Sequence, residues 1–77
     1  MIYTIKAIVF RGAESGYVAE CAELPVVTQG ATLDEVTQNL RDAIALHLEG
    51  ESLAELGFTA SPPILVSYEM EPLRAQA

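Results

Sequence analysis

With 77 residues the chain is long enough for one small domain, and such a domain buries only about 60% of the surface that its unfolded form exposes. A single cysteine excludes an intrachain disulfide and a cysteine-rich metal site, and no stretch approaches the roughly 20 apolar residues of a membrane-spanning helix. Eleven acidic residues against four basic ones give a net charge of -7, which disfavours direct nucleic-acid binding because little positive charge is present to neutralise phosphates.

The composition also bears on compartment and assembly. Cysteine usage indicates a reducing, cytoplasmic setting, and residues 1–6 alternate like a strand where a signal peptide would be charged and then apolar. Apolar residues make up 51% of the chain, which is high for this length, so we expect part of the apolar surface to be buried in a homo-oligomer. The acidic balance suits a basic partner, or it serves solubility alone.

The first part of the chain predicts an antiparallel meander of three strands. Residues 1–10 alternate, residues 11–16 have the glycine content of a hairpin loop, residues 17–22 return, and residues 26–29 form a short third strand. The first strand is expected to bury Tyr3, Ile5, Ala7 and Val9. Its opposite side is not purely polar, because Ile2, Ile8 and Phe10 lie there, so we expect something to cover that side near the strand ends.

A long amphipathic helix is predicted from Leu33 to about Leu48. Gly30 allows the backbone a sharp change of direction, Thr32 is the expected N-cap, and Glu35 completes a capping box three residues later. Gly50 is the expected stop. The apolar face is predicted to comprise Leu33, Val36, Leu40, Ala43, Ile44 and His47.

After the helix, residues 51–56 fit a further short helical turn, and residues 59–63 form a proline-stiffened connector. Residues 64–70 predict a fourth strand at a sheet edge, open to pairing with another chain, and residues 72–77 a loose tail. Three apolar side chains pack either on the core or on a second subunit: Leu53, Leu56 and Phe58. The predicted fold is therefore α+β, a β-β-β-α-β domain over residues 1–71 in which the helix packs on the sheet.

Three motifs occur in a fixed order: Gly16–Cys21 followed by Leu24-Pro25, then Thr28–Gly30, then Thr32–Val36 running into the helix. Together they resemble the HicB-like family, the antitoxin half of HicBA toxin–antitoxin pairs, and its single-domain relatives. The chain departs from the family pattern at Ala22, Val26, Val27 and Val36, which indicates a diverged or stand-alone member. The resemblance covers about residues 3–50, and the sequence leaves no room for the C-terminal DNA-binding domain of full-length antitoxins, so we do not expect direct operator binding.

The resemblance implies a degraded ribonuclease H-like domain that docks onto a small, basic HicA-like RNase toxin and covers its catalytic histidine. The expected protein is then an interaction module and not an enzyme. One alternative is an orphan domain that self-assembles into a dimer or tetramer through exposed sheet edges and has no toxin. A weaker alternative is a degenerate nuclease that retains metal binding.

The candidate partner-binding residues are Tyr17, Glu20, Glu23, Tyr68 and Glu69. Tyrosine is frequent at interface hot spots, although packing of strand tyrosines across a sheet is the more ordinary outcome. Gly30, Thr32 and Glu35 are assigned structural roles.

No catalytic, cofactor or metal site is predicted. His47 is the only histidine and is expected at the edge of the core, donating to a carbonyl of the last helical turn, and Cys21 is interpreted as a small buried hydrophobe. Four carboxylates, those of Glu20, Glu23, Asp34 and Glu35, would hold Mg²⁺ only if they converged in space.

Overall fold

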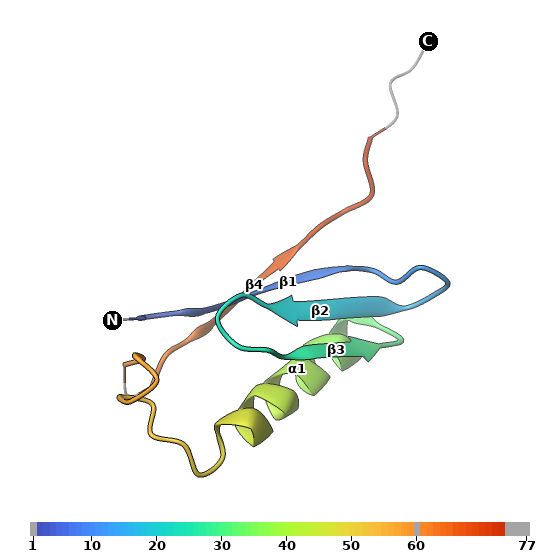
Figure 1. Cartoon of the computed structure of the whole chain (residues 1–77). Coiled ribbons are helices and arrows are strands. Elements are labelled where there is room, and N and C mark those ends of the chain that lie inside the picture. The colour runs from blue at the N-terminus through green and yellow to red at the C-terminus, as the bar shows by residue number, and fades with distance from the viewer. Residues whose placement is uncertain (1, 60, 74–77) are drawn as a thin grey trace.

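Four strands and one helix form two layers in the computed structural model, which describes residues 2–59 and 61–73 (Figure 1). The elements in chain order are β1 (Ile5–Arg11), β2 (Tyr17–Cys21), β3 (Val27–Gly30), α1 (Leu33–Leu48) and β4 (Ile64–Tyr68). The α+β class and the β-β-β-α-β order predicted from the sequence are confirmed.

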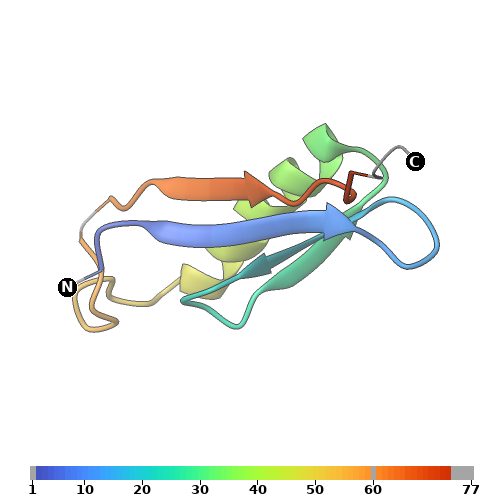
Figure 2. The same cartoon turned by 90° about the horizontal axis from the view of Figure 1, so that it is seen from above.

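The sheet has the strand order β3-β2-β1-β4. β1 and β3 pair antiparallel to β2, whereas β4 pairs parallel to β1. A parallel strand cannot be reached by a tight turn, so the chain needs a crossover connection, and α1 supplies it between the two edges of the sheet (Figure 2). This crossover places the helix on one face of the sheet, and none of the described helices or strands covers the other face.

The first strand begins later than predicted, at Ile5, and Tyr3 is 68% exposed where a buried position was expected. The pairing of Ile2 explains why β1 begins late. Ile2 forms an isolated parallel bridge with Phe58, in which its N–H donates to the Gly57 carbonyl and its own carbonyl accepts from Thr59. The chain start is therefore tied to the segment after the helix before it enters the main ladder.

The helix begins and ends where the sequence predicts. Thr32 has the extended angles of an N-cap, and its Oγ1 accepts from the Glu35 N–H at 3.0 Å. The Glu35 carboxylate reaches back to the N–H of Ala31 at 3.0 Å, one residue earlier than the usual capping-box partner. Gly50 follows the helix with a φ of 77°, which is the left-handed conformation expected of a stop.

Gly30 has a different role from the one predicted. Its φ is not positive, so the turn does not depend on conformational freedom there. A Cβ at this position would instead lie 2.5 Å from the Val36 nitrogen and 2.8 Å from its Cα. Gly30 is required because the first turns of α1 pack directly against the end of β3.

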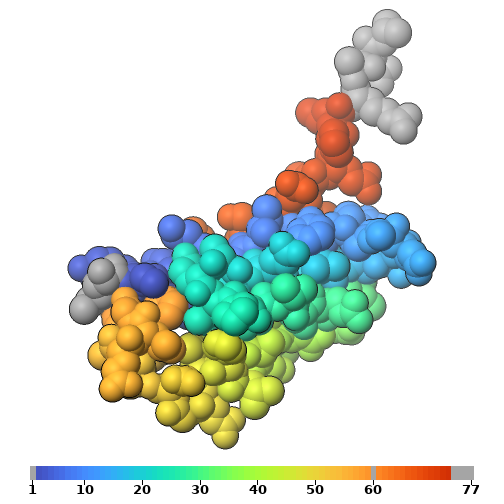
Figure 3. All heavy atoms as spheres, viewed as in Figure 1, coloured from blue at the N-terminus to red at the C-terminus, as the bar shows by residue number. Residues whose placement is uncertain are grey.

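Just beyond β4, the N–H of Glu69 still donates to the Val9 carbonyl; the chain then leaves the sheet and extends away from the body of the molecule (Figure 3). β4 ends at Tyr68, two residues earlier than predicted. Leu73 is fully exposed. Residues 74–77 of the expected tail lie outside the described residues.

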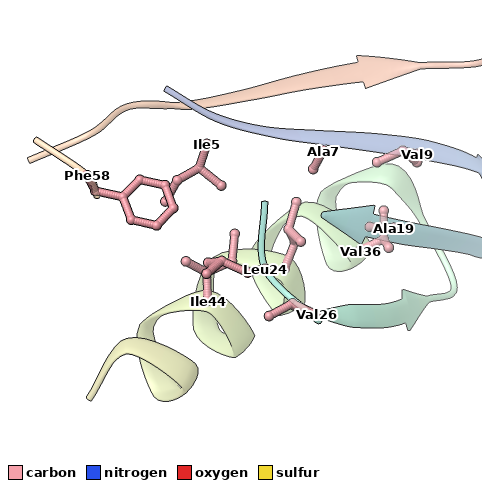
Figure 4. Close-up of a cluster of buried hydrophobic side chains, with 10 residues drawn as sticks. Ile5, Ala7, Val9, Ala19, Leu24, Val26, Val36, Ile44 and Phe58 are labelled. Carbon is pink, nitrogen blue, oxygen red and sulfur yellow. The ribbon is translucent and has the colours of Figure 1, made fainter. Parts of the chain in front are cut away.

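The core lies between the sheet and the buried side of α1 (Figure 4). Its buried side chains are Ile5, Ala7, Val9, Ala19, Leu24, Val26, Val36, Leu40, Ile44 and Phe58. Phe58 thus packs on the core, Leu53 packs beside it, and Leu56 is 40% exposed. The turns at residues 53–57 take the place of the short helical turn expected there.

Two positions predicted on the apolar face of the helix are wrong: Leu33 at its start, which is 39% exposed, and His47 near its end. His47 is exposed, and in the described parts of the chain its side chain has no hydrogen-bonded partner. Leu48 packs against the core in its place, because the buried stripe advances by four residues at each step, through Val36, Leu40 and Ile44.

Candidate interaction surface

The side of the sheet that faces away from α1 forms a continuous surface, which we call the outer face. Alternation along each strand places there the side chains that lie between the buried ones. The outer face comprises Lys6, Ile8, Phe10, Val18, Glu20, Val27, Gln29, Leu65 and Ser67. In the parts of the chain that the structure describes, no second layer covers it.

The outer face carries more apolar than polar side chains and two charged ones, the carboxylate of Glu20 near its centre and the ammonium group of Lys6 on β1. Val27 is 66% exposed and Leu65 57% exposed, although both lie in strands. Ile8 on β1 is flanked by Glu20 on β2 and by Ser67 on β4. A shallow hollow of about 320 Å³ lies over this row. An exposed apolar patch with a polar rim is the ordinary mark of a protein-binding surface.

The two candidate tyrosines meet on the opposite, helix-facing side. Tyr17 on β2 and Tyr68 on β4 reach across β1, and their rings pack edge to face with centroids 6.0 Å apart and an interplanar angle of 66°. The guanidinium of Arg11 lies 5.3 Å from the centre of the Tyr17 ring, and its Nη1 is 3.8 Å from Glu71 Oε1. The tyrosines therefore support each other across the sheet, while Tyr68 stays 41% exposed.

The three candidate carboxylates do not lie together. Glu20 is exposed on the outer face, and Glu69 is exposed immediately after β4. Glu23, in the loop after β2, is half-buried, and its Oε1 accepts the backbone N–H of Lys6 at 2.7 Å. The sheet thus separates Glu20 from the tyrosine pair. Glu23 instead accepts the N–H of Lys6 just past the end of the β1–β2 pairing, where β2 no longer offers a backbone partner.

The carboxylates considered for Mg²⁺ are also dispersed. Glu23 and Glu35 each accept a backbone N–H, as described above. Within residues 2–59 and 61–73, no three histidine, cysteine or acidic side chains gather closely enough to hold a metal ion. Cys21 is half-buried and packs against the core.

Another hollow, of about 660 Å³, lies between the hairpin loop at residues 12–16 and the start of α1. Two polar side chains that line it are engaged within the fold. Glu35 caps the helix, and Asn39 Nδ2 donates to the carbonyl of Gln29 on β3 at 2.8 Å. Sequence reasoning missed Asn39, and the only signal for it was a poor helix former in the middle of a helix.

No helix in the described part of the chain is both long and apolar enough to cross a membrane. Comparisons of the chain with models of protein families, with curated proteins and with solved structures found no match.

Proposed function

We propose that this chain is a HicB-like antitoxin-type interaction module, which binds and neutralises a small, basic, HicA-like RNase toxin in the cytoplasm. The observation that carries the proposal is the uncovered outer face, an apolar surface with Glu20 near its centre on a chain of net charge -7. A sheet with one helix packed on it also agrees with the sheet-and-helix domain that the resemblance to HicB-like domains implies.

Charge and apolar area have separate roles in this proposal. The acidic field of the chain attracts a basic protein over a distance and speeds their encounter. Ile8, Val27 and Leu65 then provide apolar area that is lost from water in the complex. The toxin is silenced because the bound chain covers its catalytic surface, so inhibition requires no catalytic group on this chain.

The proposal is tested by co-expression with the short basic reading frame that we expect beside the gene. We expect co-elution of the two proteins in gel filtration and protection of RNA from cleavage. Absence of both co-elution and protection would remove the proposal.

A charge reversal on the outer face locates the contact. Glu20→Lys should slow association several-fold, because it replaces the central carboxylate of the outer face by a positive charge facing a basic partner. Glu51→Lys changes the net charge equally at an exposed position after the helix and should have a clearly smaller effect. Equal slowing by both variants would show that only the overall charge matters and that the outer face is not the contact.

The alternative of an orphan, self-assembling domain is favoured by one observation, the open edge of β4. The neighbouring gene distinguishes the two functions. A toxin gene beside this one favours neutralisation, whereas self-assembly requires no partner gene.

A further inference from the structure

The two edges of the sheet are treated differently by the fold. At the β3 edge, the N–H of Cys21 donates to the Val26 carbonyl at 3.0 Å, so alternation turns the backbone groups of Val27 and Gln29 outward. The outward carbonyl of Gln29 is occupied by the side-chain amide of Asn39 from α1. This edge is short, and the helix closes part of it.

In the part of the chain that the structure describes, the β4 edge carries no such protection. The N–H of Ile5 donates to the Pro63 carbonyl at 2.9 Å, and the N–H of Glu69 donates to the Val9 carbonyl at 2.8 Å. Because a parallel ladder uses alternate residues, Leu65 and Ser67 face β1 between these two bonds. The backbone groups of the other β4 residues, Ile64, Val66 and Tyr68, consequently point to the open side.

The side chains of β4 match this open edge. Within Ile64–Tyr68 there is no charge, no proline and no bulge, which are the devices that normally keep edge strands apart. Val66 is 37% exposed and Leu65 57% exposed. On a chain of net charge -7, this strand is an uncharged segment at which two copies can approach without placing carboxylates opposite each other.

We infer that β4 pairs with β4 of a second copy of this chain, antiparallel about a two-fold axis through Val66, so that two sheets join into one. With Val66 opposite Val66 of the partner subunit, Ile64 lies opposite Tyr68 of the partner subunit, and each of these residues donates and accepts one backbone hydrogen bond. This register uses the whole strand, since Pro62 and Pro63 precede it and the chain leaves the sheet after Glu69.

The dimer and toxin binding use different groups of β4, because the dimer pairs the outward backbone groups of Ile64, Val66 and Tyr68, whereas β4 contributes the side chains of Leu65 and Ser67 to the outer face. The failure of the dimer and the failure of the proposed function are therefore separable. Sedimentation of the purified chain without any partner tests the dimer alone, and we expect twice the mass of the 8.3 kDa chain at micromolar concentration.

Two variants with the same charge change locate the interface. Val66→Glu places two carboxylates in contact on the axis and should give a monomer, whereas Val27→Glu adds the same charge to the exposed valine of the other edge strand and should remain dimeric. Circular dichroism of each variant establishes that it is folded. A wild-type monomer, a dimeric Val66→Glu, or a Val27→Glu monomer would overturn the inference.

Mixing opposite charges tests the register. Val66→Lys alone should also be monomeric, but an equimolar mixture of Val66→Glu and Val66→Lys should recover a dimer, because residue 66 of one copy then faces its opposite charge on the other. A mixture in which both variants stay monomeric would refute the two-fold axis at Val66.

Discussion

At the scale of single residues, the junction from β3 into α1 is fixed by contact distances. Gly30 has ordinary backbone angles, yet any Cβ at this position would collide with the backbone of Val36. The helix and the strand end approach this closely because only Ala31 and the N-cap Thr32 lie between Gly30 and the first helical residue, Leu33. The junction therefore requires a residue without a side chain at position 30 and a hydrogen-bond acceptor at position 32.

Gly30→Ala should lower the free energy of unfolding by roughly 1–3 kcal/mol, because backbone atoms must move to accept the methyl group. Urea denaturation measures the change. Gly50→Asn is the control, since Gly50 has a positive φ that asparagine tolerates and a Cβ there meets nothing within 4 Å. A Gly30→Ala protein as stable as the Gly50→Asn protein would contradict the steric account.

Thr32→Ala removes the oxygen that accepts the Glu35 N–H and should lower the free energy of unfolding by about 1 kcal/mol. Thr32→Ser keeps an oxygen at the same position and should recover most of that loss. Thermal unfolding followed by circular dichroism compares the two, and equal losses would show that the hydroxyl does not cap the helix.

These residues also show how far sequence reasoning reaches. The spacing of Thr32 and Glu35 predicted the cap, because that interaction is local. The reason for Gly30 was not predictable, since it depends on how closely the helix packs back onto the strand. His47 was misplaced because helical spacing alone allows the residue after Ile44 on the buried face to be either three or four positions later. The structure uses four, so Leu48 and not His47 packs on the core.

At the scale of elements, the alternation of side chains at β3 places one residue in the core and the next on the outer face. Val26, just before the strand, is 6% exposed and lies in the core, whereas Val27 is 66% exposed on the outer face. The sequence places the two valines in one predicted strand and does not distinguish them. Their different burial follows from the register with β2.

Val26→Thr should lower the free energy of unfolding by roughly 1–3 kcal/mol, because it buries a hydroxyl in apolar surroundings. Val27→Thr, the same substitution one residue later, should change it by less than about 0.5 kcal/mol. Chemical denaturation of both variants tests the assignment. A larger loss at Val27 would mean that the outer face is covered and Val26 is not.

The arrangement of the elements was only partly predictable. Antiparallel pairing of the first three strands followed from their short connections. A place for the fourth strand at a sheet edge was also expected, but neither its parallel direction nor its neighbour β1 was read from the residues, because local patterns carry no information on long-range pairing. The apolar side chains of Ile8 and Phe10 led us to expect a cover over that side of β1 near the strand ends, and within the described residues no such cover is present: Ile8 is 39% exposed.

At the scale of the whole molecule, the acidic charge acts oppositely on the two proposed assemblies. Two copies that each carry a net charge of -7 repel, so the dimer through β4 relies on backbone pairing and apolar contact. A basic toxin is attracted by the same charge. The outer face and the β4 edge thus bind through different forces.

Salt should therefore separate the two assemblies. Raising the ionic strength screens the repulsion and should tighten the dimer, whereas it should slow association with the toxin. Sedimentation of the chain alone and stopped-flow association with the toxin, each at low and high salt, measure the two effects. A dimer that dissociates as salt is added would show that ion pairs hold it together, contrary to the uncharged strand described here.

The most direct test of the account is amide hydrogen exchange along β4. In a single copy, the N–H of Ser67 is bonded to β1, whereas those of Val66 and Tyr68 face the open side and should exchange rapidly. We predict that all three amides are protected in concentrated solution, and that dilution removes the protection of Val66 and Tyr68 only. Rapid exchange of Val66 at every concentration at which Ser67 is protected would contradict the account.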